Sequence, residues 1–532
     1  MRHRWLLTGI ILLALALRVI GISTYPAGFS ADEVGQGYTA YSILKTGKDE
    51  WGEFLPLAPR SYGDYRAPLY TYLTIPSVAI FGLTEFAVRL PNALAGTAAV
   101  GVVYFFVLEV FKKRKVAIFS AFLLAISPWH VTLSRGAFEP NLPTLLIPLG
   151  WLLFEKDKKD KWLMILSGLT FGLALFSYYS ARFLVPVLVF GLLYEYYRKA
   201  KKLPWGLLVT FGAFALIAGY TMFYGGGTRS SDVAITSPTH GWGAVSDKRY
   251  EAILLGLPDF VSRAFNNKLT YTVGEFTKSY LSYSSPQFLF TNGAGEATYG
   301  MFPGQGLLYL IEVLFLGSFL VFLTKNFKAF PKLILLWLLI APIPAALAKG
   351  PGFAANRVAL AMPFVQIILA LGAIALLKRT PKVVFLAVYS LMLVLFLENY
   401  FFHAPAANAR SMSYGWREIM NFVNENNAKY SKIVVSRNFS EPQMFVAFYG
   451  KMDPGVVQKE SSDWLRYEEQ GLKFVDQLGE YSLGKFLFTS IENSSPQEGV
   501  LRVGKPEEFK AGARVVQIIA YLDGKPAILL VE

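Results

Sequence analysis

Long apolar stretches recur along this chain, with polar loops between them. Trp5 to Ile22 and Trp205 to Tyr224 are two examples, and each approaches the roughly 20 apolar residues that a helix needs to cross a bilayer. Of the 532 residues, 54% are hydrophobic and only 17% are charged. Because soluble domains do not repeat such stretches so often, the sequence predicts a polytopic α-helical membrane protein.

Clusters of Lys and Arg lie in several of the loops and predict their side of the membrane, because basic residues in short loops stay cytoplasmic. The clusters are Lys112 to Lys115, Lys156 to Lys161, Arg198 to Lys202, Lys325 to Lys332 and Lys378 to Lys382. A net charge of +14 could also indicate nucleic-acid binding. Since much of the excess charge lies in these loops, orientation and contact with anionic lipid headgroups explain it better. We expect no nucleic acid as a partner.

The segment 67–83 decides whether all the clusters fall on one side. Counted as a span, it would place Lys112 to Lys115 outside. It is short, begins at Pro68, contains Pro76 and ends at Gly82, which suits a re-entrant or interfacial helix better. About eleven spans then remain, and they place every cluster inside. These spans are 5–22, 88–111, 116–132, 141–154, 162–178, 181–197, 204–224, 305–324, 332–348, 357–377 and 383–402.

The spans divide the chain into two predicted domains. Residues 1–402 form the membrane domain, with a cytoplasmic N-terminus and outer regions at 23–87, 133–140 and 225–304. The first span follows a basic start and resembles a signal peptide, but no small-residue cleavage pattern follows Ile22, so we expect it to be retained. Multi-pass insertion in the cell (plasma) membrane follows from this layout.

The sequence pattern of residues 403–532 predicts a small extracytoplasmic α+β domain. Trp416 to Asn427 has helical spacing, and the segments 432–435 and 485–489 have the composition of strands. Val515 to Leu522 and Ala527 to Val531 flank Asp523-Gly524, a pattern typical of a β-hairpin.

Two adjacent acids, Asp32 and Glu33, follow the first span. Ser30 and Glu33 have capping-box spacing, and acids suit the first turn of a helix, so a purely local role would explain both. At a membrane interface, the same pair could take a proton from a hydroxyl or hold a divalent cation. The local sequence leaves both interpretations open.

Further charged residues lie in the outer regions. Arg66 precedes the interfacial helix, where it could reach lipid headgroups or bind the phosphate of a lipid. The second outer turn adds His130, Arg135 and Glu139 to the same face. A lone histidine is more often structural than catalytic, but this combination of side chains favours a site. There is no cysteine, so thiol chemistry and Cys-based zinc sites are excluded.

The order and spacing of several short motifs resemble the GT-C superfamily of integral-membrane glycosyltransferases, closest to its protein O-mannosyltransferase and aminoarabinose-transferase group. The similarity covers about residues 5 to 400. The motifs are Asp32-Glu33; Arg66-Ala67-Pro68-Leu69-Tyr70; Phe81-Gly82 with Glu85 and Arg89-Leu90-Pro91; Ser127-Pro128 through Glu139; Ser285 through Phe290; Pro303-Gly304 with Gly306 through Tyr309; and Asn356-Arg357 before Pro363.

The resemblance implies an inverting transfer of a hexosyl or pentosyl residue from a polyprenyl-phosphate donor to an acceptor hydroxyl on the outer face. The acceptor could be a protein, a lipid or a polysaccharide. By the same resemblance Asp32 is the base, and Glu33 or Glu139 supports the acceptor or, together with Asp32, holds Mg²⁺ or Mn²⁺. The implied donor-binding residues are Arg66, Tyr70, His130, Arg135 and Arg357.

Two departures from the family pattern concern donor binding. Related chains often have a basic residue or histidine where this one has Glu296 to Tyr299, and Lys-Pro where Arg66 is followed by Ala67.

A transporter or lipid flippase is the alternative function, although such proteins usually have ionisable residues in mid-span and internal repeats. A membrane scaffold without catalysis is a third hypothesis, which the outward acids and arginines disfavour.

Overall fold

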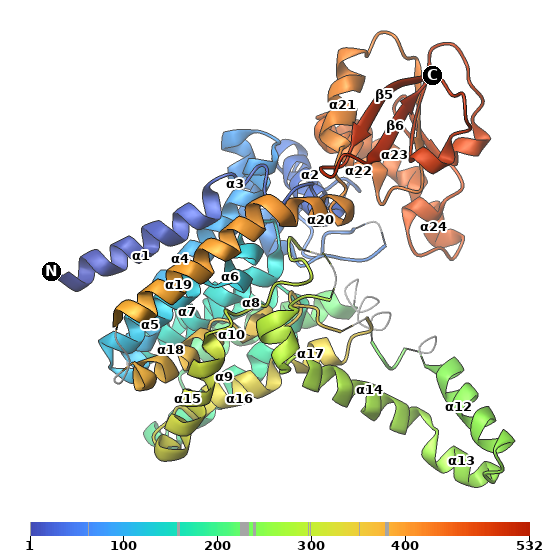
Figure 1. Cartoon of the computed structure of the whole chain (residues 1–532). Helices are drawn as coiled ribbons and strands as arrows, with labels where there is room; N and C mark the ends of the chain where they lie inside the picture. The colour runs from blue at the N-terminus through green and yellow to red at the C-terminus, as the bar shows by residue number, and fades with distance from the viewer. Residues whose placement is uncertain are drawn as a thin grey trace.

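The computed structural model describes residues 2–61, 63–156, 160–223, 234–237, 241–295, 297, 299–350, 352–377 and 382–532. Parts of two basic clusters (157–159 and 378–381), the end of the 204–224 span, much of 225–240, and Glu296 and Thr298 lie outside the described residues. The described chain is mostly helical. A bundle of helices carries a smaller sheet-containing domain at one end (Figure 1).

The bundle is built from apolar helices that share one large hydrophobic core. Its helices are α1 (Arg2–Val19), α4 (Glu85–Phe111), α5 (Arg114–Ile126), α6 (Pro128–Ser134), α7 (Leu142–Lys156), α8 (Lys161–Leu175), α9 (Tyr179–Ala200), α10 (Trp205–Thr221), α15 (Glu312–Asn326), α16 (Lys332–Ile340), α17 (Ile343–Ala346), α18 (Phe364–Leu376) and α19 (Lys382–Glu398).

Several of the predicted spans are broken or short. By length and hydropathy, two described helices could cross a membrane, Glu85–Phe111 and Val383–Ser411, and the pair α5 and α6, bent by 58°, would be a third. Shorter apolar helices occupy other predicted spans, such as Trp205–Thr221 and Phe364–Leu376. Proline accounts for the break at Pro128 and for the one before α17, because its ring cannot continue a regular helix. The number of spans stays a prediction.

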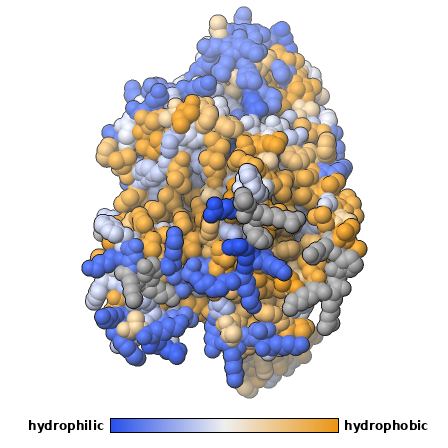
Figure 2. All heavy atoms as spheres, turned by 90° about the vertical axis from the view of Figure 1, so that its left-hand side faces the viewer, coloured by the Kyte–Doolittle hydropathy of each residue, from blue (hydrophilic) through white to orange (hydrophobic). Residues whose placement is uncertain are grey.

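The described basic loops gather at one end of the bundle. Ring contacts join the helix ends that flank them: Phe111 lies 5.9 Å from Phe330, and Phe154 lies 6.0 Å from Tyr196. Lys112 to Lys115 are exposed there. Figure 2 shows a broad hydrophobic surface between a hydrophilic upper end and hydrophilic groups at the lower end. This banded surface is what a bilayer-embedded bundle requires.

The outer regions contain helices of their own. In the first, α2 (Ala31–Thr46) begins with the predicted capping box, in which Ser30 and Glu33 bond reciprocally. The predicted interfacial helix is α3 (Pro68–Phe81), with Pro68 in its first turn and Gly82 as its C-cap. Between Glu139 and Asn141 the second outer turn forms the short helix η1. The third region contains α12 (Trp242–Leu254), α13 (Asp259–Phe265), α14 (Lys268–Ser282) and η3 (Gln287–Thr291).

The C-terminal domain contains a six-stranded sheet in the order β2-β3-β1-β4-β6-β5. Strand β1 lies parallel to β3 and β4, whereas the outer pairs are antiparallel. The predicted hairpin is confirmed as β5 and β6, with Gly524 at φ 81° in its turn. The strands are β1 (Lys432–Ser436), β2 (Tyr481–Leu483), β3 (Phe486–Thr489), β4 (Val500–Gly504), β5 (Val515–Ala520) and β6 (Pro526–Val531).

Helices connect this sheet to the bundle and cover it. The helical stretch that starts at Val383 continues past the predicted boundary at residue 402 to Ser411, so a helix leads directly into the domain. The short helix η5 (Asn399–His403) and α20 (Ala404–Ser411) form its end. The helices of the domain are α21 (Trp416–Glu425), α22 (Pro442–Tyr449), α23 (Pro454–Trp464) and α24 (Arg466–Glu469).

The C-terminal domain and the first outer region share one hydrophobic core. Phe448 of α22 packs against Phe29 at 5.2 Å between ring centroids. It also approaches Gly37 of α2 so closely that a Cβ there would lie 2.8 Å from its ring. Polar contacts surround this core: Arg417 pairs with Glu85 at 2.6 Å, and Tyr38 donates to the Met452 carbonyl at 2.9 Å. The domain is therefore fixed against α2.

Candidate functional site

Asp32 and Arg66 face each other at the outer end of the bundle. Asp32 lies in the first turn of α2, and Arg66 ends the loop that leads into α3. Arg66 Nη2 lies 3.9 Å from Asp32 Oδ1, with the Arg66 side chain 3% exposed and that of Asp32 48% exposed. The structure thus brings together a buried cation and an accessible carboxylate that the sequence places 34 positions apart.

The Arg66 guanidinium is buried without hydrogen bonds. Its Nε, Nη1 and Nη2 atoms have no hydrogen-bond partner among the residues that the structure describes. Burying polar groups without partners costs on the order of 1–3 kcal/mol each, and more for charged groups. A planar fork of unused donors matches the oxygens of a phosphate. This side chain is therefore arranged to receive an anion.

Gly35 provides the space that the guanidinium occupies. A Cβ at this position of α2 would lie 2.0 Å from Arg66 Nη1 and 2.4 Å from Nη2. Glycine weakens a helix interior by about 1 kcal/mol relative to alanine, so its presence in α2 needs a reason. The close approach of Arg66 supplies one.

Two further side chains reach this pair from distant segments. Tyr299, from the third outer region, donates a hydrogen bond from its hydroxyl to Asp32 Oδ2 at 3.2 Å. Glu441, from the C-terminal domain, places Oε2 3.9 Å from Arg66 Nη2. Tyr299 belongs to the stretch in which the sequence departs from the family pattern. The site is thus assembled from four separate parts of the chain.

Glu33 occupies a different environment from its neighbour Asp32. It is fully buried and pairs with Arg89, whose Nε lies 2.8 Å from Glu33 Oε1. Glu33 also accepts from the backbone N–H groups of Ser30 and Ala137. Its oxygens are therefore committed to the fold, and Glu33 anchors α2 to α4 and to the second outer turn.

Hydrogen bonds within the fold occupy other side chains that were predicted to bind the donor. Tyr70 donates to the Val88 carbonyl at 2.8 Å, which ties α3 to α4. His130 Nδ1 lies 2.7 Å from Arg18 Nη2, and Arg135 donates to the carbonyls of Leu17 and Ile20 at the end of α1.

The remaining two predicted residues are Glu139 and Arg357. Arg357 donates to the Lys349 carbonyl at 2.7 Å. Glu139 begins η1 and is 9% exposed. Its neighbour Phe138 packs against Tyr299, with 5.0 Å between ring centroids. Glu139 therefore lies in the turn that contacts the tyrosine bound to Asp32.

Known proteins resemble this chain in one sequence segment and in the whole fold. Residues 65–223 match the family model of dolichyl-phosphate-mannose-protein mannosyltransferases. The chain aligns with the crystal structure of ArnT from Cupriavidus metallidurans bound to undecaprenyl phosphate. The alignment covers 98% of this chain and 97% of the ArnT chain, with 12% sequence identity and a TM-score of 0.52. The chain shares its overall fold with ArnT. The predicted resemblance is confirmed at this level.

Two further comparisons add less. The structure of ArnT from the same organism in the apo state aligns over 98% of this chain and 97% of its own, at 11% identity and a TM-score of 0.45. Comparison with curated protein sequences gives no match.

The predicted metal ligands Asp32, Glu33 and Glu139 are not assembled into a cation site. In the described part of the chain, no group of three or more His, Asp or Glu side chains is placed to hold a metal ion. The reason lies in Glu33, whose oxygens face Arg89 and backbone N–H groups rather than Asp32. The donor set of Asp32, Glu33 and Glu139 therefore does not fit a metal as arranged, and we derive no step through one.

A second buried guanidinium lies near the start of α3. Arg182 is 8% exposed, and its Nη1 and Nη2 atoms have no hydrogen-bond partner within the described residues. Its Nε donates to the Leu175 carbonyl at 3.1 Å. The next carbonyl, that of Phe176, accepts from the N–H of Leu69 in the first turn of α3. Arg182 is thus a further cation beside the helix that follows Arg66.

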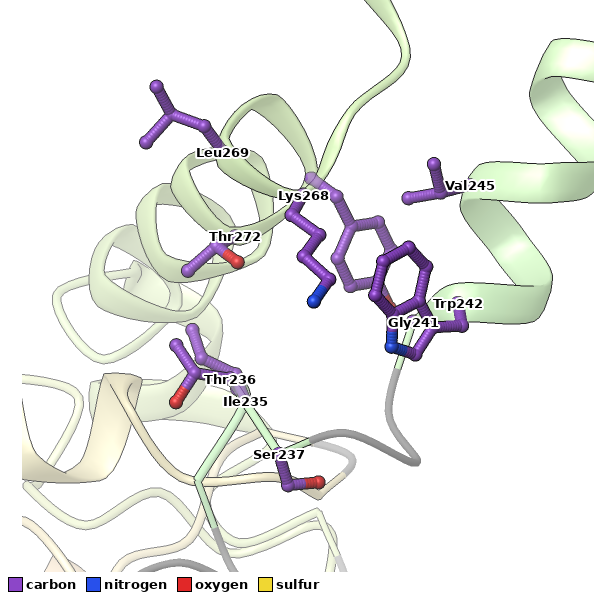
Figure 3. Close-up of a pocket in the computed structure, with 10 residues that line it drawn as sticks. Ile235, Thr236, Ser237, Gly241, Trp242, Val245, Lys268, Leu269 and Thr272 are labelled. Atoms are coloured by element: carbon purple, nitrogen blue, oxygen red, sulfur yellow. The ribbon is translucent and has the colours of Figure 1, made fainter.

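A cavity lies elsewhere, between α12 and α14 (Figure 3). It has a volume of about 340 Å³ and is lined by Trp242, Lys268, Tyr271 and neighbouring residues. Lys268 points at the Trp242 ring, with Nζ 3.7 Å from its centroid. None of its described lining residues is an acid. This cavity therefore offers no carboxylate among its described lining residues, in contrast to the pair of Asp32 and Arg66.

Three members of the site were not predicted from the sequence: Gly35, Tyr299 and Glu441. A signal existed for Gly35, because glycine within a predicted helix indicates close approach of another group. For Glu441 the sequence contains only a weak signal, the Glu-Pro pair that follows a predicted strand. Its contact with Arg66 spans 375 positions of the chain, and local sequence patterns do not report such pairs.

Proposed function

We propose that this protein transfers a sugar from a polyprenyl-phosphate donor to an acceptor hydroxyl on the outer face of the membrane, with inversion at the anomeric carbon. The observation that carries the proposal is the buried Arg66 guanidinium, which lacks hydrogen bonds among the described residues and lies beside Asp32. The mannosyltransferase family match and the fold shared with ArnT, whose crystal contains undecaprenyl phosphate, support the same donor class.

The roles follow from the chemistry of glycosyl transfer. Asp32 accepts the proton of the acceptor hydroxyl, whose oxygen attacks the anomeric carbon from the side opposite the phosphate. The bond between that carbon and the phosphate oxygen breaks, and the electron pair leaves with the phosphate. Arg66 faces the charge that develops there, and Arg182 is placed to add a second positive charge. The sugar and the acceptor class, whether protein, lipid or polysaccharide, are left for experiment.

Asp32→Asn should abolish transfer while leaving donor binding intact. The amide keeps the shape of the side chain but cannot accept a proton, and loss of a general base costs about 10²–10⁴-fold in rate. Purified protein is incubated with labelled polyprenyl-phosphate sugars, and both transfer and donor hydrolysis are measured. Asp463→Asn, at an exposed acid on α23, is the matched control. Near-normal turnover by the Asp32 variant would remove Asp32 from the base role.

The same set of donors tests the alternative function. A transporter or flippase would move a lipid without breaking the bond between sugar and phosphate. If wild-type protein neither transfers nor hydrolyses any labelled donor, the glycosyltransferase proposal fails.

We further propose that the N-terminus is cytoplasmic and that the C-terminal domain lies outside the plasma membrane. The exposed basic loops at one end of the bundle, opposite the C-terminal domain, support this orientation. Because the chain has no cysteine, single cysteines can be labelled selectively. Lys459→Cys, on exposed α23, should react with an impermeant maleimide in intact cells, whereas Lys113→Cys should react only after permeabilisation. The reverse pattern would invert the topology.

A further inference from the structure

Glu441 of the C-terminal domain lies beside Arg66, in the segment that follows the central strand β1. Strand β1 ends at Ser436, and Glu441 precedes helix α22. The domain is held against α2 by the shared core around Phe448 and by the pairing of Arg417 with Glu85. Glu441 is therefore placed beside Arg66 by a rigid contact between two parts of the fold, and not by a free loop.

The backbone at Glu441 is strained. Its φ is 50° and its ψ is 48°, in the left-handed region that non-glycine residues seldom adopt. The next residue is Pro442, and a following proline normally favours extended backbone. Such conformations cost on the order of 1–3 kcal/mol and are found mainly at functional sites. The Glu441 carbonyl nevertheless accepts from the N–H of Met444 at 3.0 Å, which fixes the turn.

The Glu441 side chain is 18% exposed, and acidic residues surround its carboxyl group. Its Oε2 atom has no hydrogen-bond partner among the described residues and lies 3.9 Å from Arg66 Nη2. Burial raises the pKa of Glu441 to about 8; Arg66 opposes this shift, while the acids Asp32, Asp64 and Asp476 add to it. The raised pKa favours the protonated form of this side chain, which has an O–H to donate.

We propose that Glu441 is a phosphate-binding residue, whose protonated carboxyl group donates a hydrogen bond to the donor phosphate held by Arg66. The inference rests on the proposed function and makes the C-terminal domain part of the donor site. A neutral acid suits this place because a carboxylate would repel the phosphate, whereas an O–H satisfies one of its oxygens. Glu441 Oε2 and the Arg66 guanidinium, which both lack hydrogen bonds among the described residues, would then share one ligand.

The test is the pH dependence of lipid binding, which does not require turnover. Full-length protein in detergent is titrated with undecaprenyl phosphate between pH 6.5 and 9.5, and the dissociation constant is compared with that of Glu441→Gln. The amide still donates a hydrogen bond but does not titrate. Between pH 7 and pH 9.5, wild type should lose about tenfold or more in affinity relative to the variant, because its protonated fraction falls above the pKa.

Two further variants separate this inference from the proposed function. Glu50→Gln replaces another buried acid near Arg66, whose pKa is also raised to about 8 by burial and by Asp49; it should keep the wild-type pH dependence. Arg66→Ala should lose lipid binding at every pH. If it binds like wild type, the phosphate site itself is wrong. If Arg66→Ala loses binding but Glu441→Gln follows the wild-type profile, or Glu50→Gln flattens it, the role of Glu441 is overturned.

Thermal unfolding is measured at each pH as a control. A carboxyl group whose pKa is raised in the folded state stabilises the fold fully below its ordinary value of 4.5, and this contribution is lost as the pH rises through about 8. Comparing wild type with Glu441→Gln at equal folded fraction removes this effect from the binding data.

Discussion

Glu33→Ala should lower the free energy of unfolding by about 3–5 kcal/mol, because removing one partner of a buried ion pair leaves the other charge uncompensated. Both side chains of the Glu33–Arg89 pair are fully buried. Arg89 also donates to the carbonyls of Ile22, Pro26 and Gly28, so the segment after α1 depends on its position. The expected result is a large decrease in the melting temperature of the purified protein in detergent.

Asp32→Asn is the matched control, since it changes the adjacent acid, whose side chain is half exposed. It should unfold like wild type and yet be inactive, whereas Glu33→Ala should lose activity in proportion to its unfolded fraction. Substitution of Glu33 is thus expected to reduce stability, and substitution of its neighbour Asp32 to reduce activity without loss of stability. A Glu33→Ala protein that melts like wild type but does not turn over would give Glu33 a role in the chemistry.

Gly35→Ala should abolish donor binding in a protein that remains folded. The added methyl group would lie 2.0 Å from Arg66 Nη1. The guanidinium is the far end of a flexible side chain and can move away, so the cost to folding is small. Alanine also favours the helix by about 1 kcal/mol, which excludes a weaker α2 as the cause. We expect a loss of at least about 100-fold in undecaprenyl phosphate affinity, as for a lost bidentate contact.

Gly274→Ala in α14 is the control, because a Cβ there meets nothing within 4 Å. It should bind and unfold like wild type. If Gly35→Ala binds the lipid normally and melts at the wild-type temperature, the position of the Arg66 guanidinium is not critical for the phosphate.

Much of the fold could be predicted from local patterns. The capping box of α2, the helix α3 and the C-terminal hairpin follow from spacing, proline and glycine, and these signals act within a few residues. Span lengths were harder to predict, because hydropathy does not reveal where a helix breaks. Pro128 follows the 58° break between α5 and α6, and the sequence alone shows that proline only as part of one apolar run.

The site was predictable only in part. Asp32 and Arg66 were both predicted, and they lie together. Asp32 and Glu33 could not be told apart in the sequence, because neighbouring residues on a helix point about 100° apart. Which of them is buried depends on Arg89, 56 positions away. Glu441 required the tertiary structure, since its partner Arg66 belongs to another domain.

The distance along the chain between α2 and Glu441 has a consequence for biosynthesis. The ribosome delivers α2 long before β1, so a nascent or truncated chain holds Arg66 without its partner from the C-terminal domain. The shared core around Phe448 and Gly37 closes only when that domain has folded. The site is therefore complete only after the C-terminal domain has been synthesised, and a copy terminated before β1 would have Arg66 without Glu441 beside it.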